Sequence, residues 1–351
     1  MKAPVLHGKR SIVFEDVPDP TPGENEVVVE VGFCGICGSD LHLYDSDMAP
    51  DGIVLGHEFG GTIVEVGKGV KGWEAGQRVV GAPMRPCMNC PFCLKADFDM
   101  CYQHYRLDAL RAGVPAAGGV SLGAGGLGRF ARITGERLMA VPDALDDRQA
   151  ASVEPAAVGF HAVRRSGIQL GDRVAILGAG PIGLFTLQCA VAAGARRVTV
   201  VEPAPLRASL ATQFGADEVL NPKEHNDLAS AVATSLGAPP DVVFDAAGVP
   251  ATLQQAVDVV KPGGSVMMVG VSFENAPVRP STWVTKRVTV RAAFAYSRAD
   301  YDATIAMLER GTVRTERIIT SVVPSSATGE TFERLLRPND EVKVLIDPRA
   351  Q

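Results

Sequence analysis

The stretch that decides the fold reads Val174-Ala-Ile-Leu-Gly-Ala-Gly-Pro-Ile-Gly183 and places glycines at Gly178, Gly180 and Gly183. A short apolar run, Arg173–Leu177, leads into the first glycine and is typical of a buried strand. The alanine-rich segment Ile182–Ala193 follows and is typical of a buried helix. The first two glycines allow a tight turn and the close approach of a pyrophosphate, and the third lets helix and strand pack closely. Because the N-terminus of such a helix also favours phosphate, the stretch predicts a dinucleotide-binding site.

Glu202 stands nineteen residues past the third glycine, at the end of a second strand-like run, Val198–Val201. A carboxylate there is expected to accept hydrogen bonds from the ribose hydroxyls of NAD and to repel the 2′-phosphate of NADP. The alternative is a tight turn followed by a surface glutamate, but the matched context of glycines and acid favours NAD binding. Arg207 follows the acid and can stack on adenine or hold a phosphate, although an arginine here is more often a solvated helix charge.

Strand-like runs alternate with helical stretches through the second half of the chain. The alternation predicts an α/β fold with a doubly wound parallel sheet, and a cofactor across the carboxyl ends of its strands. The expected strands are Arg173–Leu177, Val198–Glu202, Glu218–Leu220, Val242–Ala246, Ser265–Gly270 and Val288–Phe294.

The composition is that of an ordinary globular protein, with 351 residues, 46% hydrophobic and 21% charged, and a formal net charge of −6. Its length predicts two domains. No apolar run approaches the roughly 20 residues that a membrane helix needs, and the N-terminus lacks the apolar core of a signal peptide. The negative charge and the absence of a basic cluster argue against nucleic acid as a partner. We therefore expect a cytoplasmic protein, with no membrane partner.

The first 156 residues differ in character, because short strand-like runs alternate there with glycine and proline breaks. This pattern predicts a compact β-rich domain. Six of the seven cysteines lie before residue 102. Without a secretory signal, clustered cysteines indicate metal ligands more often than disulfides.

Four of these cysteines, Cys87, Cys90, Cys93 and Cys101, follow a Cys-x2-Cys-x2-Cys-x7-Cys spacing. Four thiolates on one loop can close a tetrahedral zinc site that has no open position and contributes to folding rather than to chemistry. An iron–sulfur cluster uses similar spacing and is the main alternative. Nothing else in the sequence indicates electron transfer, so the pattern favours a structural zinc.

A second candidate set consists of Cys37 and the neighbours His57 and Glu58. A cysteine, a histidine and a carboxylate form a mixed ligand set that suits zinc. Three protein ligands leave one coordination position open for water or substrate, as a catalytic site requires. On spacing alone, a buried cysteine and an unrelated loop histidine are the slightly favoured interpretation, because Cys and His at this separation are common.

Several motifs occur together in a fixed order: Cys37-Gly-Ser-Asp-Leu-His42, Gly56-His-Glu58, the four-cysteine segment and Gly178–Gly183. In this order they resemble the medium-chain zinc-dependent alcohol dehydrogenases, in particular the sorbitol, butanediol and threonine dehydrogenase branch. The resemblance runs nearly end to end. It implies a GroES-like catalytic domain with a structural zinc lobe over 1–156, a Rossmann NAD-binding domain over 157–289, and a return segment over 290–351 that completes the catalytic domain. Lys286–Phe294 and Val342–Ile346 resemble the family's returning strands.

The resemblance also implies the zinc ligands. Cys37, His57 and Glu58 are carried over as the set that holds the catalytic zinc. Glu154, in the segment Val153-Glu-Pro-Ala-Ala157, corresponds to an acid that lies beside the metal, either directly or through water. Asp40 is expected to orient His57 without touching the substrate.

Ser39 and His42 are the candidate catalytic residues, because the proton of the substrate hydroxyl needs a route to solvent. The Ser39 hydroxyl can both accept and donate a hydrogen bond, and His42 titrates in a useful range to finish the relay. The alternative is that both residues merely cap and solvate a helix that begins at this motif.

Two further segments, Asp245–Gly248 and Val269–Val271, resemble the family's nicotinamide-side loops, although each residue in them fits an ordinary strand exit equally well. The residues predicted to bind the cofactor are Gly178, Gly180, Pro181, Ile182, Gly183, Glu202, Arg207, Val269 and Val271.

The activity that the resemblance implies is hydride transfer between a secondary alcohol, a diol or a polyol, and NAD, with a ketone as product. Sugars and amino-alcohols such as threonine are alternative substrates. A non-catalytic nucleotide-binding protein is the alternative class, but the complete set of Cys37, Ser39, His42, His57 and Glu58 favours an enzyme.

Two segments depart from the family's pattern and bear on the choice of substrate. The stretch between Cys37 and His57 is shorter than usual, and Tyr105–Arg129 is longer and richer in glycine and alanine. The strand Ser265–Gly270 and the segment Phe273–Thr285 match the region through which family members pair their nucleotide domains. We therefore expect a homodimer or homotetramer.

Overall fold

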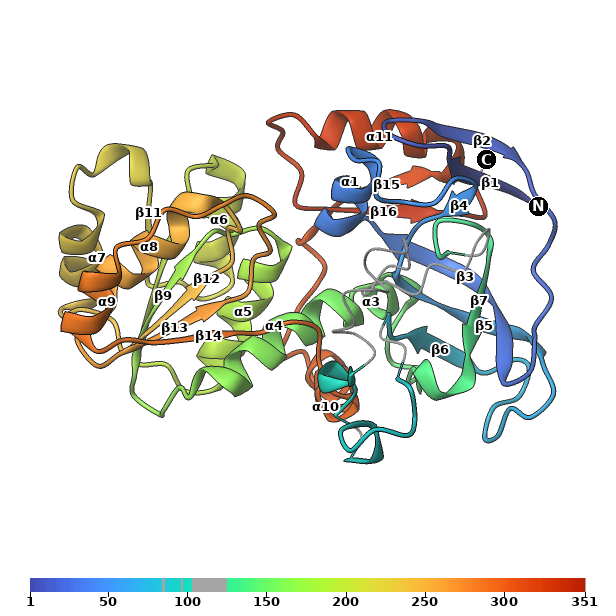
Figure 1. Cartoon of the computed structure of the whole chain (residues 1–351), viewed down its shortest axis with the longest axis horizontal. Helices are drawn as coiled ribbons and strands as arrows, with labels where there is room; N and C mark the ends of the chain where they lie inside the picture. Colours follow the sequence, from blue (N-terminus) through green and yellow to red (C-terminus); the bar gives the residue numbers. More distant parts are fainter. Residues whose placement is uncertain (84–85, 96, 103–124, 351) are drawn as a thin grey trace. The chain divides into compact units, whose positions relative to one another are not determined.

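The computed structural model describes residues 1–83, 86–95, 97–102 and 125–350. Most of the glycine-rich segment Tyr105–Arg129 therefore lies outside the described residues. The chain divides into two compact units (Figure 1). The first comprises Met1–Glu154, Ser297–Glu309 and Ile319–Gln351, and the second comprises Pro155–Tyr296 and Arg310–Ile318. The stretches 290–296 and 310–318, which were predicted to return to the catalytic domain, thus group with the second unit.

Two sheets form the first unit. The smaller has the order β2-β1-β4 and contains β1 (Lys2–Leu6), β2 (Ile12–Asp16) and β4 (Ile53–Val54). The larger has the order β15-β16-β3-β5-β6-β8, with β7 also paired to β3. Its strands are β3 (Glu26–Gly35), β5 (Glu58–Val66), β6 (Arg78–Gly81), β7 (Phe130–Thr134), β8 (Leu138–Ala140), β15 (Ile319–Pro324) and β16 (Lys343–Asp347).

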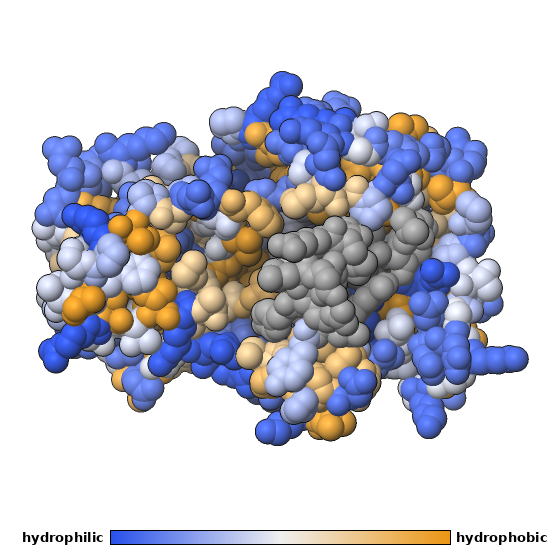
Figure 2. Space-filling model, viewed as in Figure 1, coloured by the Kyte–Doolittle hydropathy of each residue, from blue (hydrophilic) through white to orange (hydrophobic). Residues whose placement is uncertain are grey.

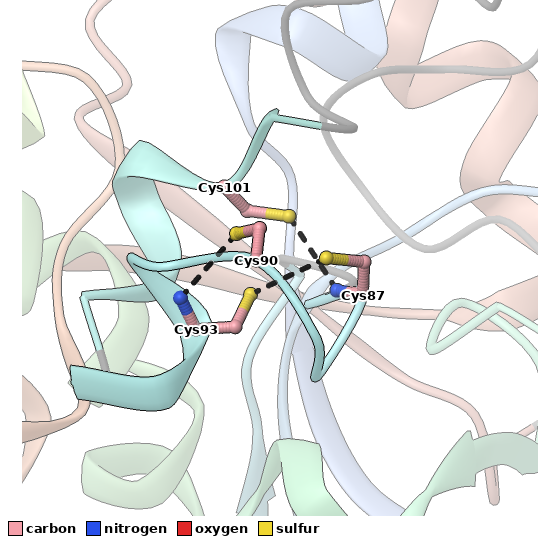
Figure 3. A group of neighbouring side chains, drawn as sticks. All are labelled: Cys87, Cys90, Cys93 and Cys101. Atoms are coloured by element: carbon pink, nitrogen blue, oxygen red, sulfur yellow. Dashed lines mark hydrogen bonds between the residues drawn. The ribbon is translucent and has the colours of Figure 1, made fainter.

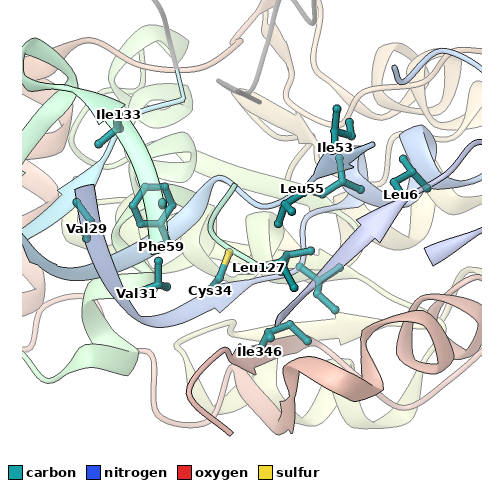
Figure 4. Packing of buried hydrophobic residues seen from close by; sticks show 14 of the residues in the cluster. Leu6, Val29, Val31, Cys34, Ile53, Leu55, Phe59, Leu127, Ile133 and Ile346 are labelled. Carbon is teal, nitrogen blue, oxygen red and sulfur yellow. The ribbon is translucent and has the colours of Figure 1, made fainter. Parts of the chain in front are cut away.

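Strand β3 is central to this sheet because it pairs with β5, β7 and β16. Its valines and Cys34 join Phe59 of β5, Ile133 of β7 and Ile346 of β16 in one buried cluster (Figure 4). Burying these β-branched and aromatic side chains is the main force that holds the strands together.

Short helices complete the first unit. They are α1 (Gly38–Tyr44), α3 (Asp147–Ala151), α10 (Arg298–Glu309) and α11 (Thr328–Leu335), with 3₁₀ turns at Cys93–Lys95, Phe98–Met100, Gly135–Arg137 and Ser325–Ala327. Phe332 of α11 is fully buried and packs edge-to-face on Tyr44, which fixes this helix against the end of α1.

The second unit is a six-stranded parallel sheet with the order β11-β10-β9-β12-β13-β14. Its strands are β9 (Arg173–Leu177), β10 (Arg197–Val201), β11 (Glu218–Leu220), β12 (Val242–Asp245), β13 (Ser265–Met268) and β14 (Thr289–Ala292). Its helices are α4 (Val153–Ser166), α5 (Pro181–Ala192), α6 (Pro205–Gln213), α7 (Leu228–Leu236), α8 (Pro250–Val259) and α9 (Pro280–Lys286), with a 3₁₀ turn at Pro222–Glu224. This is the doubly wound sheet that the sequence predicted, and its strand order reverses between β9 and β12.

The segment Lys286–Phe294 was given two interpretations, and the structure decides between them. The strand Val288–Phe294 of the parallel sheet is confirmed, and the returning strand is wrong. The segment Lys286–Phe294 contains β14, which pairs in parallel with β13 and so belongs to the dinucleotide-binding sheet. The physical reason is its apolar alternation, because Val288 and Val290 pack on the buried cluster of the second unit. The other prediction, Val342–Ile346, corresponds to β16 in the first unit, whereas its parallel neighbour β15 was not predicted. Among the described residues, no helix combines the length and apolar character that crossing a bilayer requires.

Candidate metal and cofactor sites

The four cysteines of the Cys-x2-Cys-x2-Cys-x7-Cys segment gather at one point (Figure 3), and their Sγ atoms all lie within 4.8 Å of one another. The Cys87 N–H donates to Cys101 Sγ, and the Cys93 N–H donates to Cys90 Sγ, each at 3.4 Å. The bond from Cys93 lowers the pKa of the Cys90 thiol to about 6, because an N–H donor stabilises the thiolate. All four cysteines are free of disulfides. The arrangement fits a closed tetrahedral site for zinc.

Cys37, His57 and Glu58 form the second group, and their ligand atoms also lie within 4.8 Å of one another. Cys37 is the N-cap residue of α1, while Glu58 is the first residue of β5 and His57 directly precedes it. Nineteen residues of sequence separate the cysteine from the histidine. The fold therefore assembles this group, since the local chain alone does not. A thiolate, an imidazole and a carboxylate suit zinc and leave one tetrahedral position open.

Asp40 connects two members of this group. Its Oδ2 accepts the Cys37 N–H at 2.9 Å, and its Oδ1 lies 3.5 Å from His57 Nδ1. Burial disfavours a charged imidazole, but the negative charges of Asp40 and Cys37 outweigh it and hold the pKa of His57 well above its usual value. Because Nδ1 faces Asp40, Nε2 is the nitrogen left to bind a metal. Asp40 is buried where the sequence predicted an orienting role for it.

Glu58 has a partner that the sequence reasoning missed. Lys343 of β16 donates from Nζ to both Glu58 carboxylate oxygens, at 2.8 and 2.6 Å, and to the Ile36 carbonyl at 2.9 Å. Burial disfavours the charged ammonium, but the charge of Glu58 outweighs it and raises the pKa of Lys343. The only signal in the sequence was a lysine at the start of the apolar run Val344–Ile346, where a buried strand has no reason to carry a charge.

The remaining predicted residues of this site lie on helices. Ser39 and His42 are exposed and stand three positions apart on α1, so they share one face of that helix. Capping of α1 is provided by Asp40 and Cys37, not by Ser39. Glu154 is buried in the first turn of α4. In the described part of the chain, the compact groups of potential ligands are the four cysteines and the Cys37 set, and Glu154 belongs to neither.

The three glycines of the turn in the second unit lie in different environments. Gly178 has a φ of +93°, and a Cβ there would lie 3.0 Å from the backbone of Ala247. A Cβ at Gly183 would lie 2.0 Å from the Gly178 oxygen, so the helix packs directly on the turn. A Cβ at Gly180 would meet nothing within 4 Å. Since Gly180 is the N-cap of α5 and Pro181 and Ile182 begin that helix, this open space at a helix N-terminus fits a pyrophosphate.

Glu202 directly follows β10 and is buried. Its Oε2 accepts the Ala179 N–H at 2.7 Å, and its Oε1 accepts the Ala204 N–H at 2.8 Å. The acid thus lies against the glycine turn. Each carboxylate oxygen keeps a second lone pair for a ribose hydroxyl. Of the other predicted contacts, Arg207 lies on α6, Val269 is buried just past β13, and Val271 is exposed.

Comparison with known proteins agrees with this geometry. Residues 23–143 match the alcohol dehydrogenase GroES-like domain, and residues 181–310 match the zinc-binding dehydrogenase domain. The sequence is 32% identical over 364 residues to (R,R)-butanediol dehydrogenase of Bacillus subtilis strain 168, covering 99% of this chain and 100% of that protein. The chain belongs to the zinc-dependent medium-chain alcohol dehydrogenase family. Sorbitol dehydrogenase of the same organism is 31% identical and covers 99% and 97% of the two chains.

A solved structure extends the comparison to the cofactor. A putative zinc-binding dehydrogenase from Sinorhizobium meliloti 1021, crystallised with NADP, superposes with a TM-score of 0.87 at 30% identity over 99% of both chains. The family membership confirms the predicted enzyme class over the non-catalytic alternative. The protein is a dehydrogenase that uses zinc and NAD(P).

Proposed function

We propose that this dehydrogenase oxidises a secondary alcohol, a vicinal diol or polyol, to the ketone and that NAD accepts the hydride. The observation that carries the proposal is the group formed by Cys37, His57 and Glu58, whose ligand atoms lie within 4.8 Å of one another. The relatives support the substrate class, because two of the most similar act, by name, on butanediol and on sorbitol.

In this proposal Cys37, His57 and Glu58 hold the catalytic zinc, with Glu154 as an exchangeable neighbour. Bound there, zinc acts as a Lewis acid that lowers the pKa of an alcohol hydroxyl. Asp40 fixes the positions of both Cys37 and His57 through its two oxygens. Ser39 accepts the hydroxyl proton and His42 passes it to solvent, for which the exposure of both side chains provides access.

The second zinc, in this proposal, is bound by Cys87, Cys90, Cys93 and Cys101 and stabilises the fold without taking part in the chemistry.

The pattern of thiols also supports a cytoplasmic location. All seven cysteines are free, and thiolate ligands of this kind persist in a reducing compartment.

We further propose that NAD is preferred over NADP. The buried carboxylate of Glu202 lies against the glycine turn, where a 2′-phosphate would meet its negative charge. This preference is a property to be measured for this chain, since one similar solved structure holds NADP and another holds NADH.

A homo-oligomer is the last element of the proposal. The predicted strand Ser265–Gly270 contains β13, which lies between β12 and β14 and so is not the sheet edge that the prediction required. The edge strand beside it in the described part of the chain is β14, whose residues are largely exposed. Apolar side chains are exposed nearby in the sequence, Phe273 at 65% and Val284 at 74%, and apolar residues are visible on this unit in Figure 2. An unpaired edge with apolar neighbours suits pairing with a second copy. Light scattering at working concentration should give twice or four times the mass of the chain, and a monomeric mass would contradict the proposal.

The function is tested by a screen of NAD reduction with the zinc-loaded protein. Diols and polyols should give the highest kcat/KM, and sugars, threonine and simple primary alcohols serve as comparison substrates. A clear preference for threonine or for a sugar would overturn the proposed substrate class but leave the dehydrogenase assignment intact. Activity with NADP equal to that with NAD would contradict the role of Glu202.

A further inference from the structure

The ammonium group of Lys343 is buried and fully hydrogen-bonded, unlike that of a surface lysine. All three N–H donors of its ammonium group are used, two on the carboxylate oxygens of Glu58 and one on the Ile36 carbonyl. The lysine side chain is 4% exposed and the glutamate side chain 1%. A buried ammonium is tolerated only where it is paired in this way, so the contact is specific.

The carboxylate that Lys343 holds is also the one that belongs to the Cys37 group. Both oxygens of Glu58 are occupied by Nζ, yet a carboxylate oxygen of Glu58 lies within 4.8 Å of the Cys37 and His57 ligand atoms. A metal ion bound by these three residues must therefore share Glu58 with Lys343 or displace one of its hydrogen bonds.

The backbone behind Glu58 restricts how this competition is resolved. Gly35 of β3 pairs with Glu58, and a Cβ at that position would lie 2.1 Å from Glu58 Oε2. The carboxylate is thus packed against bare backbone on one side and held by the ammonium. Its room to move lies toward Lys343 or toward the metal ligands.

The negative charges around Glu58 require a nearby cation. Lys343 interacts electrostatically with Glu58, Cys37 and Glu154. The buried carboxylate of Asp40 lies beside Cys37 and His57 in the same part of the first unit. A buried cluster of this sign is costly without a cation, and either the ammonium or a metal ion can supply one.

We propose that Lys343 is a positioning residue of the metal site, which holds Glu58 as a counter-charge when zinc is absent and competes with zinc for Glu58 when it is present. This inference rests on the proposed assignment of Cys37, His57 and Glu58 as zinc ligands. It makes the site stable without metal and keeps zinc less tightly bound than the same three ligands would hold it alone.

The test measures zinc affinity rather than turnover. Zinc content is followed by elemental analysis of the full-length protein after equilibration with a graded series of a zinc chelator. The zinc equivalent that is lost in Cys37→Ser is the one bound at the Cys37, His57 and Glu58 site. Lys343→Met should bind this equivalent at least about tenfold more tightly than wild type, since both oxygens of Glu58 are then free of the ammonium and available to the metal. Lys343→Arg keeps the positive charge. Its zinc affinity should therefore lie within about threefold of the wild-type value or below it.

Stability gives a second readout. Without zinc, Lys343→Met leaves Glu58 buried and unpaired, so its melting temperature should fall. Zinc should then raise that temperature more in the variant than in wild type, because tighter binding stabilises the folded state more. Lys343→Gln, whose amide can still donate to Glu58, replaces the methionine variant if that one does not fold.

Two controls separate the proposal from simpler effects. Lys286→Met removes another partly buried lysine, one that donates to the Val257 and Asp258 carbonyls in the second unit, and should leave zinc affinity unchanged. In a Glu58→Gln background, Lys343→Met should change zinc affinity by less than about threefold, since a neutral amide attracts neither cation strongly. A full tenfold gain in that background would show that Lys343 acts through general charge and would overturn the competition for Glu58.

The outcomes also distinguish this inference from the proposed function. Retention of every zinc equivalent by Cys37→Ser would contradict the proposed catalytic site itself. Loss of one equivalent in Cys37→Ser, together with unchanged zinc affinity in Lys343→Met and Lys343→Gln, would contradict only the role of Lys343 and leave it a structural ion pair.

Discussion

The two candidate metal sites of the first unit are built in opposite ways. The four cysteines lie within fifteen consecutive residues, and their Sγ atoms meet because the local chain turns tightly. The Cys37 site takes its ligands from α1 and from the start of β5, and the partner of one ligand from β16, 285 residues later. A local site can serve the fold by closing a loop. An assembled site depends on the fold. It can therefore leave a coordination position open, and distant residues can alter how its ligands bind the metal.

The largest expected effect separates these two roles. Cys37→Ser should lower kcat/KM by at least about 10³-fold, because the loss of Lewis-acid stabilisation is worth several kcal/mol, while the melting temperature stays near that of wild type. Cys101→Ser should instead lower the melting temperature by on the order of 10 °C. Calorimetry and steady-state kinetics on both variants check the contrast. Equal loss of stability in the two proteins would mean that both sites are structural.

Ser39→Ala sharpens the comparison within the assembled site. Because Ser39 is exposed on α1 and donates to none of the metal ligands, its loss should leave zinc content intact. If it carries the proton, kcat should fall by roughly 10²-fold or more, within the span expected of acid–base groups. Full activity in the zinc-replete variant would direct attention to Glu58 or Glu154 acting with a water molecule.

The second unit repeats the contrast, since its glycine turn is local whereas Glu202 reaches the turn from β10. Glu202→Ala should weaken NAD use and should narrow the preference over NADP by about tenfold, because both a ribose acceptor and a repelling charge are lost. The Ala179 and Ala204 N–H groups also lose their acceptor, so the measurement should be kcat/KM for each cofactor alongside a melting curve. Unchanged selectivity in a stable variant would contradict this role.

The smallest effect is expected for His42. His42→Ala should lower kcat only a few-fold, because water can replace an exposed imidazole at the end of a relay. Its signature is the pH profile of kcat, which should change shape since an imidazole that can take up and release the proton is removed. The matched control is His225→Ala, which lies just past a 3₁₀ turn of the second unit and should leave the profile as it is.

The sequence predicted the local features of this protein best. The glycine turn, the alternating strands and the four-cysteine segment are each encoded within a few tens of residues, so their patterns are visible without the fold. The proposed catalytic ligands were predicted mainly through resemblance, because Cys37 and His57 are brought together by the pairing of β3 with β5.

Features that depend on distant pairing were missed or misplaced. The alternating valines of Lys286–Phe294 suit the edge of either sheet. The segment was therefore predicted both as a strand of the parallel sheet and as a returning strand, and only the pairing of β14 with β13 decides between them. Strand β15 is half-buried along its whole length and gives no alternation to detect. Lys343 could not be assigned a partner from the sequence, because nothing local links it to Glu58.

The separation between Glu58 and Lys343 also has a consequence during synthesis. At about 5 to 20 residues per second, a ribosome adds the lysine roughly 15 to 60 s after the glutamate. Throughout that interval β3 lacks its neighbour β16, and Glu58 lacks the ammonium partner that would compensate the burial of its charge. The second unit, by contrast, has all of its residues once Ile318 has been added, which precedes the addition of Lys343. We therefore expect the nascent chain to fold its dinucleotide-binding unit first and to keep the carboxylate of Glu58 in water until the last strand emerges.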